Sequence, residues 1–430
     1  MTGDDPIPNG EASTGIPSDY ANLDELVGPT PIAEDDRRHD FQRQPSLETV
    51  RREEQKGREE ETRSRRFDAT FPRTSSYLPH KVQNFSTELY TISYLVVFAI
   101  LGTLARLGLE ALTFYPGTPA WYGTLWANFG GCVVMGFLSE DRRLFEAPDE
   151  TRHPKAADAD AAAKKAHTAM KKTIPLFIGL ATGFCGSFTS FSRFLNDAFL
   201  ALSNDLPTPT NAESSRAAGY SVMAVLAVII TTISVSISGL KMGAHLALSL
   251  DKHTPRLPSL ALVNPLAIFL AISMWLGAIF LAIFSPSNAW RGQVLFSLVF
   301  APLGCLLRFY LSRALNSRLA AFPLGTFTAN MSGTLILGMA WDLQRVPLSP
   351  FHIPGGSITT CQVLEGVQGG FSGCLTTVST WVLELNGLRP RHAYVYGGVS
   401  VSLALASLVV VMGSLRWTRG FEQPICVIPP

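Results

Sequence analysis

The apolar residues of this chain are gathered into blocks of roughly 20 or more residues, the length that a helix needs to cross the hydrocarbon core of a bilayer. All of these blocks follow residue 86. A soluble protein of this length would show shorter amphipathic periods instead. The composition agrees with this pattern, since 47% of the residues are hydrophobic and only 16% are charged. The pattern predicts an all-α, polytopic membrane protein that contacts the lipid bilayer.

The apolar blocks predict about nine transmembrane helices. They cover about residues 89–112, 120–138, 174–200, 220–248, 262–284, 293–315, 322–339, 362–385 and 395–415. Lys and Arg favour the cytoplasmic side of a membrane. They cluster in the loop at residues 139–173 and are scarce at 113–119 and 201–218. This bias predicts a cytoplasmic N-terminus and an extracellular C-terminus.

The polar N-terminal segment and the cysteines indicate which parts of the chain lie outside the helical core and how the core is packed. Residues 1–84 are rich in Asp, Glu, Arg, Pro and Ser, and such a segment buries too little apolar surface to fold. The net charge of +1 gives no sign of a nucleic-acid partner. Most cysteines lie inside apolar blocks without metal-ligand spacing, so we interpret them as small packing residues and predict no disulfide framework. The cysteines are Cys132, Cys185, Cys305, Cys361, Cys374 and Cys426.

An internal repeat relates two parts of the chain. GTLWANFGGCVVMG at residues 123–136 matches GTFTANMSGTLILG at residues 325–338, with six of fourteen positions identical. The pairs at this offset of 202 residues include Asn128 with Asn330, Gly131 with Gly333, Gly136 with Gly338, and Arg106 with Arg308. The paired glycines predict close packing between helices, because small residues let membrane helices approach one another.

A second motif repeats at a different offset. GFCGSFTSFSRF at residues 183–194 matches GFSGCLTTVSTW at residues 370–381, at an offset of 187. Each half then has four helices, and the odd helix between them turns the second half over in the membrane. The sequence therefore predicts two homologous four-helix units in inverted, antiparallel orientation, joined by one linker helix.

These patterns divide the chain into five expected segments. They are a disordered, charged cytoplasmic tail at 1–84, a first four-helix unit at 85–250, a linker helix at 251–289, a second four-helix unit at 290–416, and a short extracellular tail at 417–430.

Polar residues inside the apolar blocks are the candidate functional groups. A side-chain amide at the position of Asn128 or Asn330 is costly in a membrane unless it bonds a partner helix or lines a hydrated path. In the second motif, Gly followed by Thr or Ser favours a helix break, and the freed carbonyl groups of such a break can bind a cation. The alternative is a kinked helix that serves packing alone.

Aromatic and basic side chains flank these polar groups. Phe188, Phe191 and Phe194 have the spacing of one helical face, where they either contact lipid or present their positive ring edges to an anion. Arg106 and Arg308 are expected near the ends of their helices, where a long side chain reaches the membrane surface at low cost. They would anchor the helices there or attract anions into a vestibule. No catalytic motif is present, so we do not predict an enzyme.

The repeated motifs resemble those of the fluoride channel family. The residues that carry the resemblance are ANFGG with a following Gly, GFCGSFTSFSRF, and the Gly-x-x-x-Arg of the first predicted helix. Bacterial members are small four-helix proteins that pair as antiparallel dimers, and eukaryotic exporters fuse two such units through an extra helix. The chain is similar to the fused type over about residues 86–416, which implies a pseudo-dimer within one monomer.

The resemblance implies roles for individual residues. The paired pore phenylalanines would be Phe191 and Phe194, but the second half has Val378 and Trp381 at the matching positions. Arg193 also departs from the pattern, because the family has Thr or Ser there. The remaining implied residues are the pore asparagines Asn128 and Asn330, the pore hydroxyls Ser192 and Ser379, and Gly186, Thr189, Gly373 and Thr376, whose backbone carbonyls would hold a structural sodium ion.

The resemblance also implies a function, namely passive export of fluoride through the plasma membrane, driven by the membrane potential. A proton-coupled anion transporter is one alternative, and its titratable group would be Asp197 or Glu384. A membrane scaffold or sensor that transports nothing is the other. It explains the hydrophobicity but not the matched polar motifs.

Overall fold

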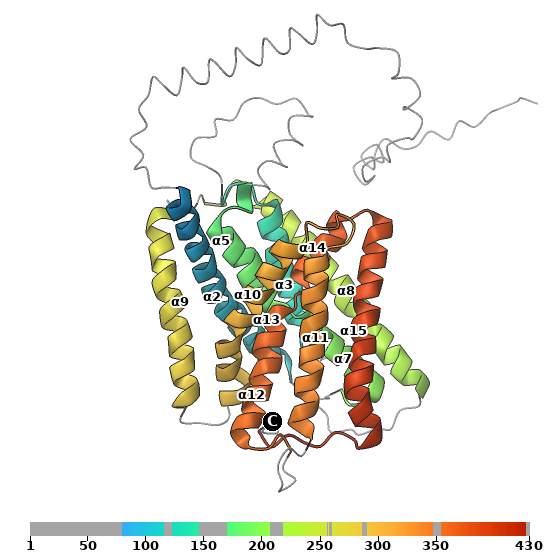
Figure 1. The fold of residues 1–430 in the computed structure, drawn as a ribbon. Helices are drawn as coiled ribbons and strands as arrows, with labels where there is room; N and C mark the ends of the chain where they lie inside the picture. The colour runs from blue at the N-terminus through green and yellow to red at the C-terminus, as the bar shows by residue number, and fades with distance from the viewer. Residues whose placement is uncertain are drawn as a thin grey trace, which may run out of the picture. The chain divides into compact units, whose positions relative to one another are not determined.

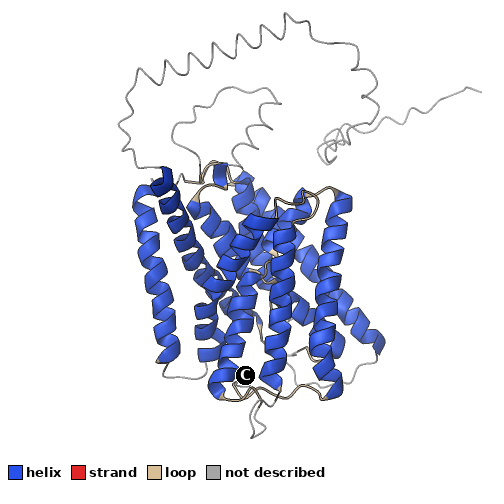
Figure 2. Ribbon diagram, viewed as in Figure 1, coloured by secondary structure: helices blue, strands red, loops and turns tan. Residues whose placement is uncertain are grey.

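The structure is a computed structural model that describes residues 80–115, 123–145, 170–206, 218–255, 257, 260–285, 290–346 and 354–426. Contacts divide the chain into two units, residues 1–77 and 78–430. The predicted disordered tail lies almost entirely outside the described residues. The second unit is built from helices (Figure 1 and Figure 2), and its described residues contain no β-strand.

Five helical segments are long and apolar enough to cross a membrane, which confirms the predicted all-α, polytopic membrane fold. They are α2 (His80–Thr113), α8 (Ala218–Ser249), α9 (Leu260–Ile283), the continuous η6 (Arg291–Phe296) and α10 (Ser297–Leu315), and α15 (Pro390–Thr418). The unbroken helices α3 (Leu125–Glu140) and α11 (Leu324–Arg345) correspond to two further apolar blocks. The count of nine spans and the inverted orientation of the halves remain predictions.

The two Gly- and Thr-rich motifs form interrupted helices, as the sequence predicted. In the first, α5 (Pro175–Ile178), η5 (Gly179–Cys185) and α6 (Gly186–Phe188) end at an extended Thr189 with φ −93° and ψ 151°, and α7 (Phe191–Ser203) follows. In the second, α12 (Ile358–Gly366), η7 (Val367–Ser372) and α13 (Gly373–Leu375) end at an extended Thr376 with φ −95° and ψ 155°, and α14 (Ser379–Gly387) follows. Each interruption frees backbone groups in the interior of the protein.

Small residues bring these breaks close to the neighbouring helices. A Cβ atom added to Gly131 of α3 would collide with the methyl group of Thr189, and one added to Gly333 of α11 would collide with the methyl group of Thr376. The paired glycines therefore serve the predicted close packing, and they seat each break against a partner helix. Beyond them, Gly136 packs against the backbone of Leu240 in α8.

The helix between the two halves presents large apolar side chains to its surroundings. α9 packs along α2 on one side, as Figure 1 shows. On its other faces, Phe269 is 66% exposed and Phe280 is 61% exposed. Apolar exposure of this extent along a long helix is expected where lipid tails, and not water, surround the protein. The role of α9 as a linker between two four-helix units stays a prediction.

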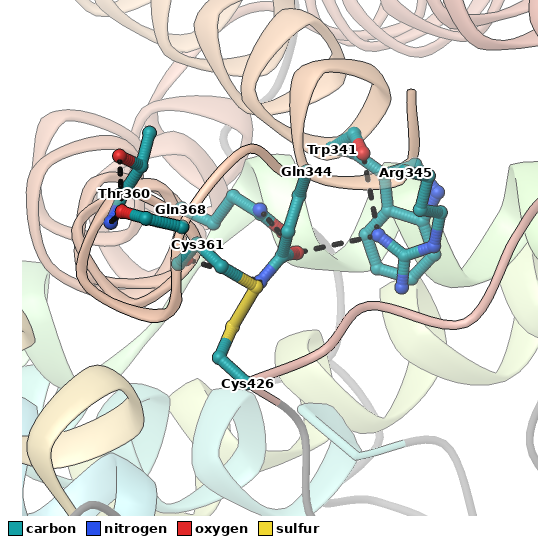
Figure 3. Close-up of a disulfide and its surroundings, with 8 residues drawn as sticks. Trp341, Gln344, Arg345, Thr360, Cys361, Gln368 and Cys426 are labelled. Atoms are coloured by element: carbon teal, nitrogen blue, oxygen red, sulfur yellow. Dashed lines mark hydrogen bonds between the residues drawn. A yellow bond between two sulfur atoms is a disulfide. The ribbon is translucent and has the colours of Figure 1, made fainter. Parts of the chain in front are cut away.

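A disulfide joins Cys361, in the first turn of α12, to Cys426 beyond α15 (Figure 3). Our interpretation of all six cysteines as packing residues is therefore wrong for these two. It holds for the remaining four, which are buried and free. The Gln344 side chain of α11 lies over the bridge and donates a hydrogen bond to the Cys361 carbonyl at 3.3 Å. The disulfide links the segment after α15 to the first turn of α12, and Gln344 adds a contact from the C-terminal end of α11.

The disulfide predicts a specific pattern of thiol reactivity. Peptide mapping of the purified protein under non-reducing conditions should recover the Cys361 and Cys426 peptides as one linked species. The variant Cys361→Ser should release Cys426 for alkylation without reductant. Alkylation of both cysteines in the unreduced wild-type protein would contradict the pairing.

Candidate functional site

The helix breaks are held by the two asparagines of the repeat. The Ser190 N–H donates to Asn128 Oδ1 at 2.9 Å, and the Thr377 N–H donates to Asn330 Oδ1 at 2.8 Å. In a continuous helix these N–H groups would bond the carbonyls of Gly186 and Gly373. Both amides are fully buried. Each asparagine therefore does bond a neighbouring helix, and it keeps a break open by taking the donor that would close it.

The threonines at the breaks join the two halves of the chain. Thr189 Oγ1 accepts the N–H groups of Val378 at 3.2 Å and Ser379 at 3.1 Å, at the start of α14. Conversely, Thr376 Oγ1 accepts the Ser192 N–H at 3.1 Å, at the start of α7. A hydroxyl that accepts such N–H groups stabilises a helix start. Each half thus caps the second helical segment of the other half.

In addition to the threonines, two buried arginines connect the broken helices of the two halves. Arg106 of α2 donates from Nε to the Ser187 carbonyl at 3.1 Å and from Nη2 to the Gly369 carbonyl at 2.6 Å. Arg308 of α10 donates from Nε to the Cys374 carbonyl at 2.8 Å and from Nη2 to the Thr182 carbonyl at 2.9 Å. These acceptors are related by the same offset of 187 that relates the two motifs. Each guanidinium therefore bridges the broken helix of its own half and that of the other half.

The arginines do not reach the membrane surface as we expected. Arg106 is 0% exposed and Arg308 is 2% exposed, so the prediction that they snorkel to the surface is wrong. Glycines make their interior position possible, since a Cβ atom on Gly186 or Gly373 would collide with the guanidinium of Arg308 or Arg106. The fixed fork of a guanidinium suits two carbonyl acceptors at once.

The aromatic residues of the motif lie directly beyond the breaks. The ring of Phe191 meets that of Trp381 at 5.2 Å and that of Phe194 at 5.8 Å, both in edge-on arrangements. All three side chains are at most 1% exposed, and Val378 is fully buried too. Phe188 does not share their face, because the break interrupts the helix. Its ring lies against Gly130 of α3 instead, so the predicted three-residue stripe is wrong.

Two buried donors in this region have no acceptor among the described residues. Asn128 Nδ2 and Trp381 Nε1 make no hydrogen bond, and both side chains are at most 1% exposed. In the second half, the corresponding Asn330 Nδ2 donates to the Thr377 carbonyl at 3.2 Å. A buried donor without a partner costs about 1–3 kcal/mol. Such groups are suited to a ligand that accepts hydrogen bonds, and a small anion is one.

The predicted sodium ligands can be tested against this geometry. The carbonyls of Gly186 and Gly373 lose their helical donors to the asparagines, and those of Thr189 and Thr376 belong to extended residues at the breaks. Carbonyl oxygens suit a hard cation. No group of three or more His, Cys, Asp or Glu side chains among the described residues could hold a metal. The four carbonyls therefore fit sodium in donor chemistry.

The two acidic candidates for proton coupling have fixed partners. Asp197 accepts a hydrogen bond from Thr124 at 3.1 Å. Glu384 accepts bonds from Thr326 at 2.6 Å and Tyr396 at 2.8 Å. These threonines lie at the starts of α3 and α11, away from the break residues along the chain. Each acid therefore links its own helix to the start of a neighbouring helix.

The arginine bridges predict a stability effect. Arg106→Lys keeps the charge but reaches only one of the two carbonyl acceptors. The lost hydrogen bond should reduce the free energy of unfolding by about 1.5–3 kcal/mol and lower the melting temperature of the purified protein. Arg313→Lys is the matched control, because Arg313 is 60% exposed and, among the described residues, pairs with Glu88 alone. Equal melting temperatures for the two variants would contradict a bridging role for Arg106.

Comparison with known proteins places these features in a family. The model of the family described as CrcB-like protein, Camphor Resistance (CrcB), matches residues 93–240 and 295–414, one match in each half. A Neurospora crassa protein named fluoride export protein 1 is 56% identical over 377 residues, which cover 81% of this chain and 70% of that protein. A Candida albicans protein of the same name is 37% identical over 75% of this chain and 79% of its own length.

A bacterial relative matches part of the chain. The fluoride-specific ion channel FluC 1 of Staphylococcus epidermidis is 35% identical over 119 residues, which cover 27% of this chain and 89% of the bacterial protein. No solved structure matches the chain. The two family matches and the fungal relatives together confirm the resemblance that the repeated motifs predicted, and the chain belongs to the CrcB-like family.

Proposed function

We propose that the chain is a passive, fluoride-selective channel that exports fluoride from the cytoplasm and confers fluoride resistance. The names of its fungal and bacterial relatives support fluoride as the ion. The structural observation that carries the proposal is the pair of helix breaks, at which buried hydroxyl groups lie next to the edge-on rings of Phe191 and Trp381. No enzyme activity is proposed.

The charge near the breaks favours an anion. Arg308 is buried and, among the described residues, takes part in no ion pair. Its donor nitrogens meet carbonyl oxygens and the Cys305 sulfur. Arg106 has only a distant carboxylate, Glu110, at 4.0 Å. Two guanidinium groups in a medium of low dielectric constant produce a positive potential beside the path. Neither charge is itself on the path, so neither would trap the ion.

Replacement of the hydration shell is the main task of a fluoride path. Fluoride holds water strongly, so the protein has to offer donors of similar strength. The unpaired Asn128 Nδ2 and Trp381 Nε1 are such donors. The hydroxyls of Ser192 and Ser379 are also buried beside the breaks, and the positive ring edges of Phe191 and Phe194 add a weaker attraction. We assign these residues, with Asn330, to the fluoride path.

The driving force comes from the membrane potential. Hydrogen fluoride is a weak acid that enters cells in neutral form and dissociates inside. A negative interior then drives the anion outward by about 2.3 kcal/mol per 100 mV, so neither ATP nor coupled protons are needed.

The disulfide supports the proposed orientation in the plasma membrane. Disulfides persist in oxidising compartments and are rare in the cytosol. The Cys361–Cys426 bond therefore favours an extracellular C-terminus, independently of the Lys and Arg bias. We propose that the monomer acts as an internal pseudo-dimer.

We further propose a structural sodium ion at the four carbonyls of Gly186, Thr189, Gly373 and Thr376, where it would fix the two breaks relative to each other. The carbonyl dipoles would have to outweigh repulsion by Arg106 and Arg308. Melting temperatures in sodium and in N-methylglucamine salts of equal ionic strength test this site. Sodium should raise the melting temperature, and identical values would remove the proposal.

Fluoride efflux from liposomes tests the channel. Proteoliposomes with valinomycin should release fluoride rapidly and retain chloride. Phe191→Ala and Phe194→Ala should each slow the release at least about tenfold, a loss of about 1.4 kcal/mol. Phe280→Ala is the matched control, since Phe280 is 61% exposed on α9. Release that requires a proton gradient would instead support a transporter, and no release would support a scaffold.

A further inference from the structure

The two halves differ in sequence at Arg193 and at its partner Glu110. At the offset of 187, Arg193 corresponds to Thr380, and at the offset of 202, Glu110 corresponds to Ser312. Arg193 Nη1 lies 3.8 Å from Glu110 Oε2. An ion pair in one half therefore takes the place of two hydroxyl side chains in the other. The ion pair also holds the guanidinium toward α2.

The two halves also differ around Gly369, next to this ion pair. Arg193 Nη2 and Ser297 Oγ lie 3.1 Å and 2.6 Å from the point where a Cβ atom of Gly369 would stand. The corresponding residues of the first half are Leu95 for Ser297 and Thr182 for Gly369. Because residue 369 has no side chain, a guanidinium and a hydroxyl converge on one point beside η7. Nothing equivalent can form around Thr182.

Three buried donor atoms of Arg193, Ser297 and Arg106 have no acceptor among the described residues. Ser297 Oγ, Arg193 Nε and Arg106 Nη1 are buried atoms without a hydrogen-bond partner. Arg106 belongs to the same cluster, because its Nη2 donates to the Gly369 carbonyl at 2.6 Å. The side chains of Ser297 and Arg106 are 0% exposed. Unpaired buried donors are costly, and a small anion would satisfy several of them at once.

Carboxylates around the cluster limit how tightly an anion would bind. Glu110 lies within 4.0 Å of both arginines, and Asp197 and Glu365 act electrostatically on Arg193. Arg345 of α11 also interacts electrostatically with Glu365. Charges of both signs give weak, reversible binding, which conduction requires. The Arg193 side chain is 28% exposed at the surface of the protein.

We propose that Arg193, Ser297 and Gly369 form a separate binding site for a small anion, on the η7 side of the break, between Thr376 and the disulfide at Cys361. The identity of this anion as fluoride rests on the proposed function. Arg193 then neither blocks the path nor merely faces water. Arg193 binds the ion beside η7, and Glu110 weakens that binding.

Planar-bilayer conductance of the full chain at increasing symmetrical fluoride tests the site. Arg193→Thr introduces the residue type found in the other half, and Ser297→Ala removes only the hydroxyl. Each variant should raise the half-saturating fluoride concentration about tenfold. Conductance at saturation should stay nearly unchanged. Glu110→Gln should shift the half-saturating concentration in the opposite direction, which a purely structural role would not produce. Arg313→Thr is the control for loss of one exposed arginine.

Line broadening of the ¹⁹F signal of fluoride by the purified protein measures binding without transport. Wild-type protein should broaden the signal more than Arg193→Thr or Ser297→Ala, and less than Glu110→Gln. Equal broadening by all four proteins would overturn the site and indicate a bound water only. Ser297→Ala keeps the test valid if Arg193→Thr fails to fold. Absent conductance with the expected broadening would overturn the channel and leave the anion site standing.

Discussion

The bonds from Arg106 and Arg308 to the carbonyls of both broken helices join the two halves of the interior. A helix that stops inside a membrane exposes backbone groups that lipid cannot satisfy. Here each guanidinium satisfies one carbonyl in its own half and one in the other. The halves are therefore joined directly at the helix breaks.

The breaks then place polar groups where a small anion could use them. Asn128 and Asn330 take the N–H groups that would restore the helices, while Thr189 and Thr376 cap the helical segments of the opposite half. Phe191, Phe194 and Trp381 follow immediately and are buried against one another. The result is a polar, positively biased interior with an apolar aromatic border. That combination favours passage of an anion over tight binding.

Sequence reasoning succeeded where the signal was local. The apolar blocks predicted the helices, and the Gly and Thr pattern predicted the breaks at Thr189 and Thr376. It failed where the outcome depended on contacts between distant segments. Hydropathy along one helix suggested a surface position for Arg106, and only the approach of η7 explains its burial. Likewise, Cys361 and Cys426 meet across 65 residues, although their positions outside the apolar cores were a usable hint.

The reversal potential of single channels under a tenfold fluoride gradient, with all other ions equal, tests the central claim most directly. A passive fluoride channel predicts a reversal potential of about 59 mV in magnitude, unchanged when a pH gradient or a chloride gradient is added. A reversal potential that moves with the pH gradient would contradict the account in favour of proton coupling. One that moves with the chloride gradient would contradict fluoride selectivity.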